Sequence, residues 1–149
     1  MRTWLCLVLA TGCSTASLRA GAVVVGGTPA FQASLAFGIS GGSRRVYEMT
    51  HEHGIAAGRD GTHYITSANV AVLTLDDEDR PVARIGPRIR GNSDGASVGI
   101  RGGFFTGIAS DPKTKSGGLG VELAGGVDVD KVLAVFEANI VFHSRWSIF

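Results

Sequence analysis

The chain has 149 residues, which is enough for one domain and too few for two of ordinary size. Its 14 basic and 13 acidic residues nearly cancel, so the basic excess typical of nucleic-acid-binding proteins is missing. The 44% of hydrophobic residues argues against a disordered chain, and the 18% of charged residues is below the ~25% of a typical soluble domain.

The first residues have the layout of a secretory signal peptide. Met1-Arg2-Thr3 is a short, positively charged start, Trp4 to Ala10 is an apolar run, and small residues follow. The apolar run is far shorter than the ~20 residues that a membrane-spanning helix needs, and no later segment supplies such a helix. We therefore expect an exported protein that is not a helical membrane protein.

Two cleavage positions fit the residues that follow. Leu9-Ala10-Thr11-Gly12-Cys13 resembles the lipobox of bacterial lipoproteins, a resemblance that implies cleavage before Cys13 and lipid attached to Cys13. Ala20-Gly21-Ala22 offers instead an A-x-A site, with cleavage after Ala22. We expect residues 1–22 to form the signal region and residues 23–149 to form a single β-domain.

From Phe31 onward, apolar residues alternate with small or polar ones, and this period of two predicts β-strands. Breaks rich in glycine and aspartate separate the alternating runs. We expect seven strands, and an eighth only if Val23-Val24-Val25 belongs to one. The seven runs are 31–39, 45–58, 63–76, 83–90, 98–108, 119–129 and 132–148.

Asp60-Gly61 is the strongest hairpin signal in the chain. A two-residue turn at these positions sets Met49 opposite Val72 and Ala57 opposite Tyr64. The apolar faces of the two strands coincide in this register, which supports it.

Two prolines lie in the run that follows the acidic turn Asp76-Asp77-Glu78-Asp79. Proline has no N–H to donate to a neighbouring strand, so it is found at the edges of sheets and at irregular positions. Pro81 and Pro87 therefore predict an edge-like or interrupted strand.

Each run has one aromatic and branched aliphatic face and one face of glycine, alanine and serine with scattered charges. In a soluble β-sandwich or barrel the apolar face points inward, whereas in an outer-membrane barrel it meets lipid. The chain resembles small outer-membrane β-barrel proteins in its scarcity of lysine and in the length of its runs. Its terminal Phe149 resembles the C-terminal insertion signal of these proteins. The resemblance implies an all-β, antiparallel up-and-down barrel of about eight strands. The alternating runs account for seven of these strands. The soluble fold remains the alternative.

In a narrow barrel the small and charged face fills the interior, where buried charges need partners of opposite sign. We therefore expect a network of ion pairs between three glutamates and three arginines. These residues are Glu48, Glu52, Glu122, Arg84, Arg88 and Arg101.

His51 and His53 share one face of a strand, about 7 Å apart along the chain, where both could contact one metal ion. A third ligand is missing. We therefore expect no metal site and treat the two histidines as weak candidates.

The sequence contains no recognisable set of nucleophile, base and oxyanion donors, so we expect neither an enzyme nor a cofactor. The expected role is structural or surface-related, at the outer membrane or elsewhere in the cell envelope, with membrane lipid as the contact and without nucleic acid. Two other classes stay open: a lipid-anchored soluble β-domain that binds a ligand or an envelope partner, and an enzyme of unknown class. No particular protein or small-molecule partner is indicated.

Overall fold

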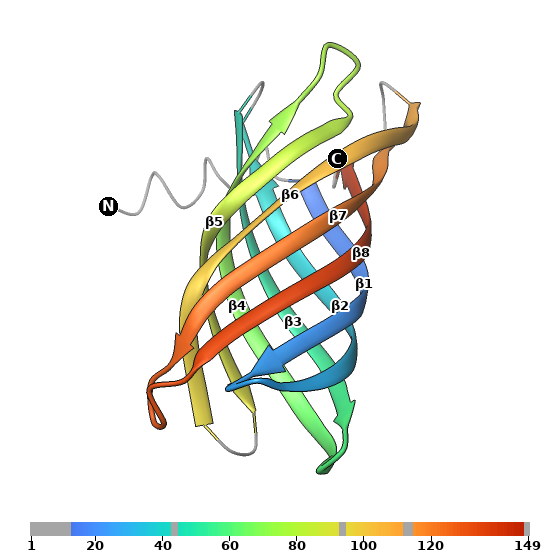
Figure 1. The fold of residues 1–149 in the computed structure, drawn as a ribbon. Helices are drawn as coiled ribbons and strands as arrows, with labels where there is room; N and C mark the ends of the chain where they lie inside the picture. The colour runs from blue at the N-terminus through green and yellow to red at the C-terminus, as the bar shows by residue number, and fades with distance from the viewer. Residues whose placement is uncertain (1–12, 43–44, 93–94, 112–114, 148–149) are drawn as a thin grey trace, which may run out of the picture.

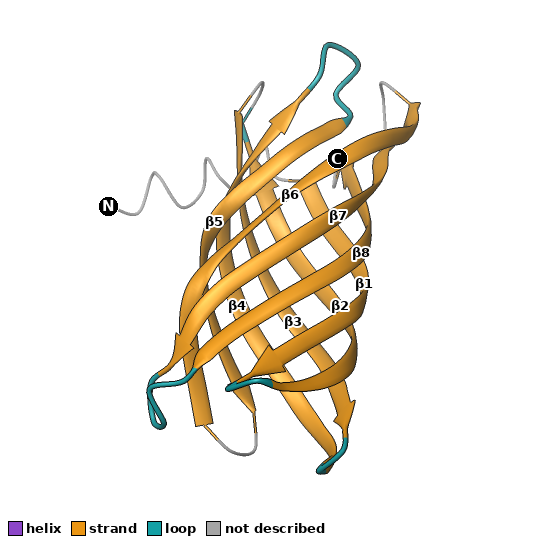
Figure 2. Ribbon diagram, in the orientation of Figure 1, coloured by secondary structure: helices purple, strands orange, loops and turns teal. Residues whose placement is uncertain are grey.

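The structure is a computed structural model that describes residues 13–42, 45–92, 95–111 and 115–147. Eight strands form a closed antiparallel barrel in chain order, and β1 pairs with β8 to close it (Figure 1). The strands are β1 (Cys13–Val25), β2 (Thr28–Gly41), β3 (Arg45–Gly58), β4 (Gly61–Leu75), β5 (Pro81–Asn92), β6 (Gly95–Asp111), β7 (Lys115–Asp128) and β8 (Ala134–Ser147). Short loops connect them (Figure 2). None of the described residues belongs to a helix that could span a bilayer.

This architecture confirms the expected antiparallel up-and-down barrel of eight strands, and no two-sheet sandwich is formed. The eighth strand is β1, which extends well beyond Val23-Val24-Val25 toward the N-terminus. Among the described residues, β1 thus starts at Cys13 rather than at residue 23. The alternation in this segment was hard to recognise because the outward positions Ala16, Ala20 and Ala22 carry only a methyl group.

The register of the β3–β4 hairpin differs from the expected one by two residues. The turn lies at Arg59–Asp60, and Met49 pairs with Val70 rather than with Val72. Gly61 follows the turn and pairs with Gly58, and its φ of 114° lies in the region that favours glycine, so the glycine closes the turn and is not a central residue. Because side chains alternate with a period of two, a shift of two residues leaves both faces unchanged.

The prolines of β5 predict an edge-like or an interrupted strand; the structure contains an interrupted strand and not an edge strand. Strand β5 pairs with β4 on one side and with β6 on the other, because a closed barrel has no edges. The β4–β5 pairing is nevertheless interrupted. It runs to Asn69 opposite Arg88 and resumes at Val72 opposite Ile85, and Pro87, which has no N–H, lies in the interval.

The outer face of the barrel is apolar on every strand. Large apolar side chains that alternate along the strands are mostly about half exposed or more. One example from each strand, in chain order, is Leu18, Phe37, Met49, Val70, Ile85, Phe104, Leu123 and Ile140.

The interior consists of three layers. At the end of the barrel where β1 starts and β8 ends, an apolar cluster comprises Val46, Leu73, Leu75, Phe105 and Val141. At the opposite end, a second apolar cluster comprises Val23, Ala56, Ile65 and Val135. Between the two clusters lies a layer of buried charged and polar side chains.

Candidate functional site: the charged barrel interior

All six residues of the expected network lie in the barrel interior and are almost completely buried. They occupy inward positions on four strands: Glu48 and Glu52 on β3, Arg84 and Arg88 on β5, Arg101 on β6, and Glu122 on β7. The alternation of each strand, together with closure of the barrel, is what directs them to a common interior.

Five of the six residues pair with one another. Arg84 donates to Glu48 over 3.3 Å and also to Glu122, and Arg101 donates to Glu52 over 2.6 Å. These contacts span the lumen, since β3, β5, β6 and β7 each contribute a side chain.

The sixth residue, Arg88, pairs with a glutamate outside the expected set. It donates to Glu137 of β8 over 2.5 Å, and Arg90 and Arg101 donate to the same carboxylate. Glu137 is therefore a centre of the network. Its inward position could have been read from the alternation of the last run, but its contacts depend on how the barrel closes.

Arg19 of β1 is a second member that the sequence analysis did not include. Its side chain is 1% exposed, and its Nε donates to Glu122 over 2.7 Å. Its Nη1 atom lies 3.9 Å from Oε2 of Glu52. The sequence pattern places this segment in the expected signal region, 1–22, and so does not indicate an inward position for Arg19.

Uncharged side chains add hydrogen bonds to two of the carboxylates. Gln32 donates to Glu137 over 3.0 Å and to Asn139 over 2.8 Å. Ser67 donates to Glu52 over 2.7 Å, and Ser34 donates to the same carboxylate. Buried charges are tolerated only when they are paired and hydrogen-bonded in this way, so the layer is built as a unit.

Ser17, His143 and Glu48 resemble a hydrolytic triad in residue type but not in geometry. The Ser17 hydroxyl is 2.8 Å from Nδ1 of His143, and a Glu48 oxygen is 3.9 Å from the same nitrogen. A triad needs the nucleophile and the acid on opposite ring nitrogens. All three side chains are buried, so the arrangement presents no accessible nucleophile.

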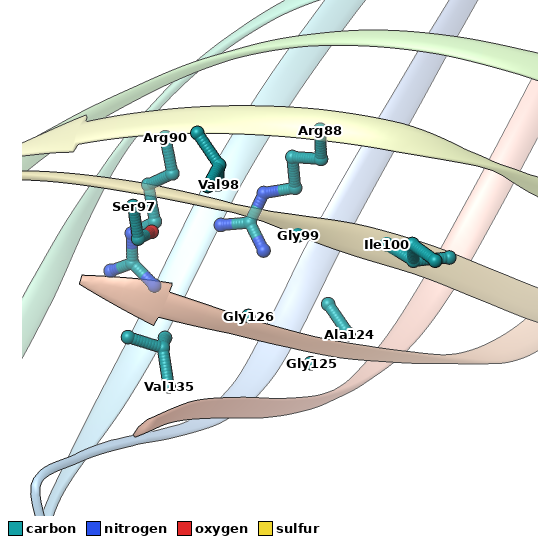
Figure 3. Close-up of a pocket in the computed structure, with 10 residues that line it drawn as sticks. All are labelled: Arg88, Arg90, Ser97, Val98, Gly99, Ile100, Ala124, Gly125, Gly126 and Val135. Carbon is teal, nitrogen blue, oxygen red and sulfur yellow. The ribbon is translucent and has the colours of Figure 1, made fainter. Parts of the chain in front are cut away.

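The space beside the arginines is small. Figure 3 shows Arg88 and Arg90 extending from β5 beside a cavity that Gly99 of β6 and Gly126 of β7 also line. The cavity volume is about 10 Å³. Such a volume holds about one water molecule and no organic substrate.

Larger spaces lie at one end of the barrel and on its outer face. A pocket of about 260 Å³ lies at the end of the barrel that carries the β1–β2 turn. Its lining includes the apolar Val23, Ala56 and Ile65 and the basic Arg59 and Lys131. A groove of about 700 Å³ on the outside runs between apolar side chains of β4 to β8. Neither space brings together the charged pairs of the interior.

The two histidines lie on the outer face, away from the charged layer. Their rings are stacked, with centroids 4.3 Å apart and planes 18° apart. Ring nitrogens bind metals in the plane of the ring, so stacked rings do not aim at one ion between them. The described residues contain no group of three or more histidines, cysteines, aspartates and glutamates that could hold a metal.

Cys13 is the first residue of β1 and is a free, partly buried thiol. Residues 1–12, which carry the signal-like pattern, and the terminal Phe149 lie outside the described residues.

Comparison of the chain with models of protein families, with curated proteins and with solved structures gives no match. The geometry of the barrel is therefore the basis for a functional conclusion.

Proposed function

We propose that the protein is a small outer-membrane β-barrel of the bacterial cell envelope, with a structural or surface role and without catalysis. The observation that carries this proposal is the distribution of polarity. Apolar side chains cover the outside of every strand, while five arginines and four glutamates are buried inside. This is the reverse of a water-soluble fold and the arrangement of a barrel whose outer face meets lipid.

The amount of exposed apolar surface supports lipid contact. Phe104 is 78% exposed, Ile140 63% and Ile85 62%. Removing one such side chain from water is worth about 1.5–3 kcal/mol, so a whole belt of them in water would be costly. Monomeric soluble proteins rarely expose contiguous apolar patches beyond about 300–600 Å².

The strand lengths and the amphipathic aromatic residues agree with this reading. The strands have 12 to 17 residues, which exceeds the about 9–11 that a tilted membrane strand needs. Tyr47 lies near the start of β3, Tyr64 near the start of β4 and Trp146 near the end of β8. Tyrosine and tryptophan favour the boundary between lipid and water.

We further propose export, with Cys13 as the lipid-bearing first residue of the processed chain. Of the two cleavage positions, the one after Ala22 would remove most of β1, including Arg19 and its contact with Glu122. Cleavage before Cys13 would leave β1 whole, and the attached lipid would then lie at one rim of the barrel.

Fractionation followed by SDS gels of boiled and unboiled samples tests the proposal on the full chain. We expect the protein in the outer-membrane fraction, with a band whose mobility shifts on boiling. The variant C13S, which lacks the lipid-accepting sulfur, should keep that shift, because the strands themselves hold it in the membrane. Release of C13S into the soluble fraction without a heat shift would reject the membrane barrel and favour a lipid-anchored soluble β-domain.

A further inference from the structure

The pocket of about 260 Å³ at the β1–β2 end of the barrel, here called the end pocket, has an apolar wall. Three members of the second apolar cluster, Val23, Ala56 and Ile65, line it. An apolar cavity of about 150 Å³ is large enough to hold benzene. The end pocket therefore has room for a small organic molecule with an apolar body.

One buried cation also lines the end pocket. Arg90 of β5 is 5% exposed, and its Nη1 donates to Glu137. Its Nε has no hydrogen-bond partner among the described residues. Arg90 lines the cavity of about 10 Å³ as well as the end pocket, so it lies where the charged layer meets the pocket.

The charged layer has a surplus of positive charge on this side. It contains five arginines and four glutamates. Arg101 pairs with both Glu52 and Glu137, whereas Arg88 and Arg90 have Glu137 as their one carboxylate among the described residues. Because buried charges need partners of opposite sign, this side of the layer favours a further anion.

The carboxylates that line the end pocket do not supply that anion. Oδ1 of Asp128 accepts the backbone N–H groups of Asp130 over 3.0 Å and of Lys131 over 2.8 Å. Asp60 is exposed in the β3–β4 turn, and among the described ion pairs neither carboxylate joins the buried guanidinium. The exposed side chains of Arg59 and Lys131 also line the pocket, and together they outweigh Asp60 and attract anions toward it.

We infer that the end pocket binds a small organic carboxylate whose apolar body is an aromatic ring or a short alkyl chain. The carboxylate pairs with Arg90, and the body packs against Val23, Ala56 and Ile65. The inference does not depend on the proposed function, because the pocket and its charges are the same whether lipid or water surrounds the barrel.

Fluorine NMR of fluorobenzoate titrated into the full chain tests the inference, with the protein in lipid nanodiscs, or in buffer if it is soluble. We expect saturable binding of fluorobenzoate and at least about tenfold weaker binding of fluorobenzyl alcohol, which has the same ring without the charge. Empty nanodiscs report partitioning into lipid. Equal affinity for both probes, or no saturable binding of fluorobenzoate to the folded chain, would overturn the inference.

The variant R90Q tests the buried cation. We expect it to bind fluorobenzoate at least about tenfold more weakly, because the carboxylate loses its partner inside the pocket. The variant should still fold, since the charged layer then has four arginines against its four glutamates. R145Q is the matched control, because Arg145 is a partly buried arginine near the end of β8, at the opposite end of the barrel. Unchanged affinity in R90Q would show that the guanidinium does not bind the probe.

A second pair of variants tests the apolar wall without changing any charge. Ala56 is 6% exposed and lines the end pocket, whereas the next residue, Ala57, is exposed on the outer face of β3. A56L should fill the pocket and remove binding, and A57L should bind as the unsubstituted chain does. Full binding by A56L, or equal loss in both variants, would place the probe elsewhere and reject the site. This pair decides the matter even if R90Q does not fold.

Discussion

At the residue scale, Glu137 is the most heavily shared carboxylate described above. Three arginines, Arg88, Arg90 and Arg101, lie within ion-pair distance of it. Because the Glu137 side chain is buried, water cannot replace its hydrogen bonds to the arginines when the residue is substituted. The guanidinium groups of Arg88 and Arg90 depend on it for neutralisation, whereas Arg101 also pairs with Glu52.

We expect E137Q to destabilise the barrel by about 3–5 kcal/mol, the cost of breaking a buried ion pair by removing one partner. The measurement is the urea dependence of the heat-shifting band in membranes or detergent. E78Q is the control, because Glu78 forms a surface pair with Arg80 that is worth about 0–1 kcal/mol. Equal stability of the two variants would contradict a structural role for the interior network.

A pair of glycines on neighbouring strands offers a second test at this scale. A Cβ atom on the inward-facing Gly99 would lie 2.2 Å from the carbonyl oxygen of Gly125, whereas one on the outward-facing Gly125 would come no closer than 3.9 Å to Phe136. We expect G99A to cost about 1–3 kcal/mol through overpacking and G125A to have little effect. The yield of folded protein on unboiled gels checks this expectation. If G99A folds as well as G125A, strands β6 and β7 can move apart at Gly99 without loss of stability.

At the element scale, the β4–β5 turn is organised by Asp76. One carboxylate oxygen accepts the backbone N–H groups of Glu78 and Arg80, both over 2.9 Å, and the other accepts from Arg80 Nε over 2.8 Å. These hydrogen bonds, above all that from the Arg80 backbone and then that from its side chain, lower the pKa of Asp76 below its ordinary value.

A lowered pKa in the folded state stabilises the fold above the pKa of the unfolded chain, and this stabilisation is lost as the pH falls through the folded value. We therefore expect D76N to be less stable than the unsubstituted chain at neutral pH, with the difference disappearing in acid. Unfolding at a series of pH values measures this. D77N, at the neighbouring exposed position, should follow the unsubstituted chain, and a D76N deficit that does not change with pH would refute the explanation.

Strand β1 is the element on which closure of the barrel depends. It pairs with β2 and β8 along its whole length and contributes Arg19 to the interior. A chain that starts at Val23 behind a foreign signal peptide should therefore give no heat-shifting band. A chain that starts at position 13 with C13S, behind the same signal, should give one. A folded barrel from the shorter chain would mean that β1 is dispensable.

At the scale of the whole molecule, the three interior layers close the lumen. Apolar clusters occupy both ends, the ion pairs fill the middle, and the cavity beside Arg88 and Arg90 measures only about 10 Å³. Small eight-stranded barrels are filled by side chains in this manner. We expect the purified protein to produce no steady ion conductance in planar bilayers. Reproducible stepwise currents would show that the interior network opens.

The sequence alone determined the strands from residue 31 onward and the composition of their two faces, because a period of two is a local property of the chain. It also indicated that Glu48, Glu52 and Glu122 share the less apolar face with Arg84, Arg88 and Arg101. It could not decide whether that face points toward water or into an interior, since a pattern of alternation is the same for either curvature of the sheet.

The tertiary structure decided the rest. Closure by β1 turned the charged face inward and the apolar face outward, and it drew Arg19 and Glu137 into one network with residues far away in sequence. The hairpin register depended on which residues form the turn, and the role of Pro87 depended on there being a strand on each side of β5. These features follow from pairing between distant segments, which no local pattern encodes.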